Sequence, residues 1–242
     1  MNPTIKQHHF AILIFDGADM LDFNGTNEDL ESRQQRQPDS HPHRANRQRH
    51  QTNRRPPHPR LVSIPTYDIL LIPGTAPSLV HALVEADKPE KELIRTFASA
   101  SSPKPRILFS ICTGSFLLGA AGILAGTTVT THQHALDVLR SICAAHGTGL
   151  YEKTRVVRRR FVDGGFVRGT RVQVITAGGI SSGLEATFYI ICLLLGAERA
   201  SWVSREMEYG WKESEDGVWP AKLVVGGGGI VGEIERRVPD LP

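Results

Sequence analysis

Two patterns of apolar positions alternate along this chain. Continuous runs of four to six apolar or β-branched residues are typical of strands buried in a parallel sheet, and apolar residues at every third or fourth position are typical of amphipathic helices. The runs predict strands within residues 10–15, 67–77, 106–111, 127–132 and 172–179. The helical pattern follows residue 74 and continues at 86–102, from 112 to about 124, at 134–147 and at 182–211. This alternation predicts an α/β fold with three layers, in which helices cover both faces of a doubly wound, mostly parallel, flavodoxin-like sheet.

Three stretches depart from this pattern. Residues 158–173 resemble a β-hairpin lengthened by several residues, and the last thirty residues have turn composition without an apolar stripe. Between residues 31 and 60 only Ala45 is apolar, and the rest is rich in Arg, Gln, His and Pro. We therefore expect one domain over 1–242, with its core at 8–30 and 65–213, a disordered insert at 31–60 and an irregular tail at 214–242.

The insert also accounts for the basic character of the chain. It contains eight arginines and two acidic residues, whereas the whole chain has a net charge of +3. A basic arm that binds nucleic acid is one interpretation, but the insert has no lysine and no interleaved aromatic residues. We favour an insertion or an error in the gene model, and expect no nucleic-acid partner.

Cysteine content and hydropathy indicate an intracellular protein. Three cysteines in 242 residues do not form a disulfide framework, and all of them lie in apolar runs. The longest apolar run, residues 186–197, is too short to span a bilayer, and no secretory signal is visible. We expect a cytoplasmic protein that does not bind membranes.

The candidate nucleophile is Cys112, because it lies where the predicted strand 106–111 turns into a helix. A nucleophile on such a turn needs small neighbours two positions away on either side, and Ser110 and Gly114 meet this need. The amino end of the following helix should lower the pKa of the thiol and favour the thiolate. The alternative is a small buried side chain, which is the interpretation we favour for Cys143 and Cys192.

Several motifs, in order, resemble a known family. The segment "SICTGSFLLGAAGILAGTTVTTHQHALDVL" resembles the nucleophile segment of the ThiJ/PfpI superfamily, which has a class I glutamine amidotransferase-like fold. The similarity is greatest to its isonitrile (isocyanide) hydratase branch. Supporting matches over residues 8–30 and 65–213 are "FDGADMLDFNG", "YDILLIPGT", "VITAGGISSGLEATF" and "EMEYGW".

The resemblance implies roles for individual residues. Cys112 matches the catalytic cysteine, and Asp22 matches the acid that hydrogen-bonds its sulfur. Gly74 matches a backbone donor to a developing anion, and Thr113 matches a residue that lines the pocket. Further pocket positions that the resemblance implies are Thr75, Glu28 and His132.

The sequence also departs from this branch. Gly25-Thr26 replaces a Gly-Pro pair, Thr75 replaces a glycine, and Gln133 replaces a tryptophan next to the site. Residues 31–60 stand where the family has its first helix and second strand.

The implied reaction adds water to an isocyanide and releases an N-substituted formamide. It needs no metal or organic cofactor, and the resemblance also implies a homodimer. Two alternatives remain open: glyoxalase III or deglycase chemistry on aldehydes, and a non-catalytic redox sensor or chaperone whose cysteine oxidises. A transcription regulator would need a helix-turn-helix domain, and only about thirty residues follow Trp211. An inactive gene product is the remaining possibility that the insert raises.

Overall fold

The computed structural model describes residues 8–24, 66–76, 79, 82, 84–85, 88–146 and 153–211. The predicted insert at 31–60, the predicted tail at 214–242 and Glu28 lie outside these residues, so those predictions stay predictions.

A five-stranded sheet forms the centre of the described structure. The strands are β1 (Phe10–Ile12), β2 (Ile69–Ile72), β3 (Arg106–Ile111), β6 (Phe161–Phe166) and β7 (Val172–Ala177). Their spatial order is β1-β2-β3-β7-β6; the first four are parallel, and β6 runs antiparallel to β7. The mostly parallel α/β sheet expected from the sequence is confirmed.

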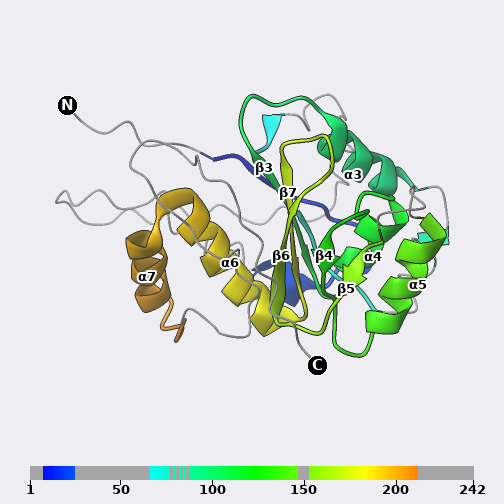
Figure 1. The fold of residues 1–242 in the computed structure, drawn as a ribbon. Coiled ribbons are helices and arrows are strands. Elements are labelled where there is room, and N and C mark those ends of the chain that lie inside the picture. The colour runs from blue at the N-terminus through cyan, green and yellow to red at the C-terminus, as the bar shows by residue number, and fades with distance from the viewer. Residues whose placement is uncertain are drawn as a thin grey trace, which may run out of the picture.

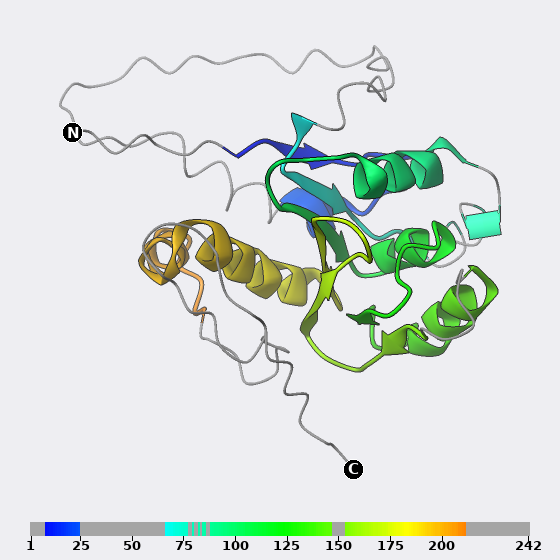
Figure 2. The ribbon, with the colours of Figure 1, turned by 45° about the horizontal axis from the view of Figure 1, so that its top comes forward.

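Helices cover both faces of this sheet (Figures 1 and 2). One face carries α3 (Pro89–Ser99), α4 (Gly114–Ala120) and α5 (Leu136–His146); the other carries α6 (Ile180–Leu195) and α7 (Ala197–Glu206). Successive strand residues divide between the two cores, because side chains alternate along a strand. Leu70 and Leu108 pack towards α3 and α4, whereas Leu71 and Phe109 pack towards α6.

Two local predictions are corrected at the ends of elements. The helix after Cys112 ends at Ala120 instead of about Leu124. It ends there because Gly122 adopts the left-handed region, with φ +76°, and donates its N–H to the Gly119 carbonyl. Strand β1, expected to be buried, is only half-buried, since it forms an edge of the sheet within the described residues.

In the remaining strands, one prediction is corrected and one is confirmed. Of the predicted strand 127–132, only β4 (Thr128–Val129) pairs, with β5 (Arg155–Val156), in a separate small sheet. The lengthened hairpin predicted at 158–173 is formed by β6 and the start of β7, and a bulge between Asp163 and Phe166 accounts for its extra length. No helix in the described part of the chain is both long enough and apolar enough to cross a membrane.

Candidate functional site

Cys112 occupies a sharp turn between β3 and α4. Its φ of +54° lies in the left-handed region, which residues other than glycine seldom adopt. Two hydrogen bonds to the Cys112 backbone hold the turn. The Cys112 N–H donates to the Ala177 carbonyl at 3.0 Å, and the Cys112 carbonyl accepts a 2.9 Å bond from the Thr131 hydroxyl. Strained backbone of this kind is a common feature of nucleophile positions.

Glycine at position 114 is required by the close approach of β2. A Cβ there would lie 2.3 Å from the carbonyl oxygen of Ile72 and 2.8 Å from that of Pro73. The predicted small neighbours of the cysteine are therefore confirmed for Gly114, and Ser110 is fully buried.

Asp22 reaches the same point from the opening loop. It lies in the helical residues 20–24, and the loop before it joins the end of β2 through a bridge between Ala18 and Thr75. Its Oδ2 accepts a 2.8 Å hydrogen bond from the Gly74 N–H. A Cβ on Gly74 would lie 2.8 Å from both Asp22 Oδ2 and Cys112 Cβ, so the carboxyl and the cysteine converge on this glycine.

Burial determines the protonation of both groups. The Asp22 side chain is 2% exposed. Its burial, opposed by the Gly74 N–H and aided by Asp19, raises its pKa from 3.8 to about 6. The pKa of Cys112 rises to about 11, first because the thiol is buried and second because the Asp22 charge is near; the Thr113 N–H acts in the opposite direction. The expected lowering of the thiol pKa by α4 is therefore wrong, and Cys112 is a thiol at neutral pH.

Two other predicted pocket residues hold the loops together. The Thr113 hydroxyl donates to the Thr75 carbonyl at 2.8 Å and accepts from the Thr75 N–H at 2.9 Å. Both side chains are buried. The expected role of the Gly74 N–H as an anion donor also needs revision, because in this structure it binds Asp22 instead.

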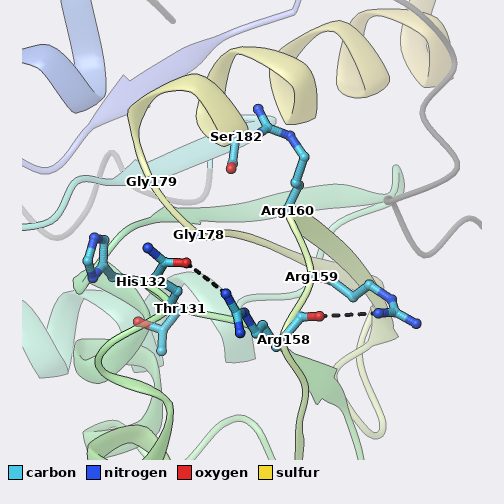
Figure 3. A pocket seen from close by; sticks show the side chains of 9 residues that line it. Thr131, His132, Arg158, Arg159, Arg160, Gly178, Gly179 and Ser182 are labelled. Atoms are coloured by element: carbon cyan, nitrogen blue, oxygen red, sulfur yellow. Dashed lines mark hydrogen bonds between the residues drawn. The ribbon is translucent and has the colours of Figure 1, made fainter. Parts of the chain in front are cut away.

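A cavity of about 410 Å³ opens beside this turn (Figure 3). It contains the predicted residue His132 and Gln133, which the resemblance placed next to the site; no pocket role was predicted for the other lining residues. Cys112 is not among the lining residues, but one of its backbone contacts, Thr131, belongs to the lining. Its other backbone contact, Ala177, directly precedes the lining residue Gly178. The cavity is lined by Thr131, His132, Gln133, Arg158, Arg159, Arg160, Gly178, Gly179 and Ser182.

Neither the other two cysteines nor the possible metal ligands form a second candidate site within the described residues. Cys143 and Cys192 are buried in apolar clusters, as predicted. Across the described ranges, no three His, Cys, Asp or Glu side chains gather as they do around a metal ion.

Known proteins share this fold. A crystal structure of a ThiJ/PfpI family protein from Pseudomonas syringae superposes with a TM-score of 0.58 at 18% identity, covering 86% of this chain and 77% of that one. Drosophila melanogaster DJ-1beta gives a TM-score of 0.54 at 16% identity, covering 85% of this chain and 100% of that one. An AraC family transcriptional regulator from Pseudomonas putida gives 0.56 at 14% identity, covering 83% and 100%.

Sequence similarity is higher for a curated protein. An isonitrile hydratase from Pseudomonas putida is 34% identical over 145 residues, which cover 60% of this chain. The match covers 53% of that relative, so the chain spans about half of its length. Residues 60–186, which include β2, the Cys112 turn and the start of α6, match the sequence profile of the DJ-1/PfpI family, and the chain belongs to this family.

Proposed function

We propose that this protein is a cysteine-dependent, isonitrile hydratase-like enzyme in which Cys112 is the nucleophile and Asp22 moves the proton. The observation that carries the proposal is the convergence of the Asp22 carboxyl and Cys112 on Gly74. The 34% identity to an isonitrile hydratase supports the choice of substrate class.

The raised pKa values fit the first step of this reaction. Near pH 7 Asp22, with a pKa of about 6, is mostly ionised, and Cys112, with a pKa of about 11, is protonated. Asp22 accepts the thiol proton as the sulfur attacks the terminal carbon of the isocyanide. It then delivers the proton to that carbon, which gives a thioimidate, R–N=CH–S, on Cys112.

Water completes the reaction. It adds to the thioimidate carbon, again with Asp22 as the proton acceptor. Asp22 passes this proton to the nitrogen, which gives R–NH–CH(OH)–S on Cys112. The carbon–sulfur bond then breaks, the remaining hydroxyl proton moves through Asp22 to sulfur, and the product R–NH–CHO leaves. The net change is the addition of one water molecule to the isocyanide, with no oxidation or reduction. Neither step requires a cofactor.

The test follows formamide formation from a simple alkyl isocyanide. We expect product with the wild type and with the control Cys143→Ala, which removes a buried cysteine outside the site. We expect none with Cys112→Ala. Equal product from Cys112→Ala would overturn the proposal, and lactate from methylglyoxal without formamide would favour the aldehyde-handling alternative.

We also propose that the enzyme is a homodimer that acts on a small molecule. Light scattering on the purified chain tests the assembly, and a mass of one chain at micromolar concentration would contradict it.

A further inference from the structure

We propose that the cavity beside the Cys112 turn binds an anionic group, a carboxylate or a phosphate, on the substrate. The preferred substrates would then be isocyanides that carry such a group. The choice of isocyanides as substrates rests on the proposed function, whereas anion binding by the cavity does not.

The lining of the cavity is positively charged. Arg158, Arg159 and Arg160 follow one another in the lining. In Figure 3 the Arg158 guanidinium lies beside Gln133, whereas the Arg159 side chain extends to the other side. Of these three, only Arg160 is neutralised: its Nε donates to Glu185 Oε2 at 2.6 Å. Within the described residues Arg158 and Arg159 form no ion pair.

The contacts of these two arginines leave donors available. Arg158 donates one bond to the Gln133 side-chain oxygen at 3.1 Å, and Arg159 donates one to the Arg158 carbonyl at 3.3 Å. A guanidinium has five N–H donors, and a carboxylate or a phosphate can accept two of them at once.

The opposite wall adds neutral donors. It is the first turn of α6, a helix of 16 residues whose N-cap, Gly179, supplies no side chain to its free N–H groups. Gly178, Gly179 and Ser182 all border the cavity. N–H groups at the start of a helix favour an anion, so this wall complements the arginines across the cavity.

The position of the cavity makes it a substrate site. The Thr131 hydroxyl in its lining donates to the Cys112 carbonyl at 2.9 Å, so a residue that lines the cavity directly contacts the backbone of the nucleophile. Its volume of about 410 Å³ is in the range typical of small-molecule sites. A substrate with an isocyanide at one end and an acid at the other would span from Cys112 into the cavity.

Binding of inorganic phosphate, measured by calorimetry at low ionic strength, tests the anion site alone. Arg158→Gln should weaken binding by about tenfold or more, because it removes a charge-assisted contact and keeps an amide donor for Gln133. The control is Arg171→Gln, at the other end of β7 from Gly178, which should change the affinity by less than about twofold. Absence of phosphate binding, or equal weakening by both variants, would overturn the site.

A matched substrate pair tests its role in catalysis. We expect 4-isocyanobutanoate to have a kcat/KM about tenfold or more above that of its methyl ester, and Arg158→Gln to remove most of this preference. Equal kcat/KM for acid and ester would overturn the substrate assignment. Phosphate binding that depends on Arg158, without turnover of either isocyanide, would refute the proposed function and leave the anion site standing.

Discussion

The backbone N–H of Gly74 donates a 2.8 Å hydrogen bond to the carboxylate of Asp22, 52 residues earlier in the chain. This bond joins the opening loop to the end of β2 and holds the carboxyl beside Cys112. The bond only partly offsets the loss of water around the carboxyl, so the pKa of Asp22 stays raised at about 6.

The pH dependence of turnover should report Asp22. We expect kcat/KM for an alkyl isocyanide to rise with pH through about 6, as Asp22 loses its proton, and then to stay level to about pH 9, because the Cys112 thiol with a pKa of about 11 remains protonated. Asp22→Asn should lower the rate by about 100-fold or more and remove the inflection. An inflection near pH 6 that survives in Asp22→Asn would exclude Asp22 as its source.

Asp22 should destabilise the folded protein at high pH. Its pKa is raised in the folded state, so the folded chain binds the proton more tightly than the unfolded chain between pH 3.8 and about 6. The free energy of unfolding therefore falls as pH rises through this window, and the full penalty, about 3 kcal/mol at most, is present above it. Urea unfolding should show Asp22→Asn to be more stable than the wild type at pH 8, with a smaller difference at pH 4.5. Lower stability of the variant at pH 8 would contradict this sign.

Alkylation should reveal the protonated thiol. With a pKa of about 11, Cys112 should react slowly with iodoacetamide at pH 7 and about tenfold faster for each pH unit up to 10. Asp22→Asn should speed the reaction, since the Asp22 charge helps to raise this pKa. Mass spectrometry distinguishes Cys112 from the buried Cys143 and Cys192, which serve as internal controls. Fast labelling of Cys112 that does not depend on pH above 7 would show an ionised thiol instead.

The fold was predictable because its strands carry a local signal. The segments at β2, β3 and β7 are almost entirely apolar or β-branched, which only a sheet covered on both faces can bury. The early end of α4 and the position of the bulge in the lengthened hairpin were not predictable, because they depend on Gly122 and Gly165 adopting positive φ in their tertiary surroundings.

The sequence predicted the position of the nucleophile, but the predicted direction of its pKa shift was wrong. The junction of strand and helix identifies Cys112 from local sequence alone. Its pKa depends on burial and on Asp22, ninety residues away, and this burial outweighs the opposing Thr113 N–H. The cavity was missed because its lining comes from three segments, around Thr131, Arg158 and Gly178, that only the fold brings together.

The space at Gly74 should be essential for catalysis. A Cβ at this position would lie 2.8 Å from Asp22 Oδ2, 2.8 Å from Cys112 Cβ and 3.0 Å from the Thr113 nitrogen, closer than packed atoms approach, so Gly74→Ala must push the acid and the nucleophile apart. Misplacement of reacting groups by about 1 Å can cost about 100-fold in rate, and we expect a loss of this size in kcat.

The matched control is Gly210→Ala. Among the residues that the structure describes, a Cβ at Gly210 meets no atom within 4 Å apart from its chain neighbours, so this substitution should leave kcat within about twofold of the wild type. Circular dichroism of both variants separates a local displacement from unfolding. If folded Gly74→Ala kept wild-type turnover, the reaction would not depend on the close approach of Asp22 to Cys112, and the proton-transfer role of Asp22 would have to be given up.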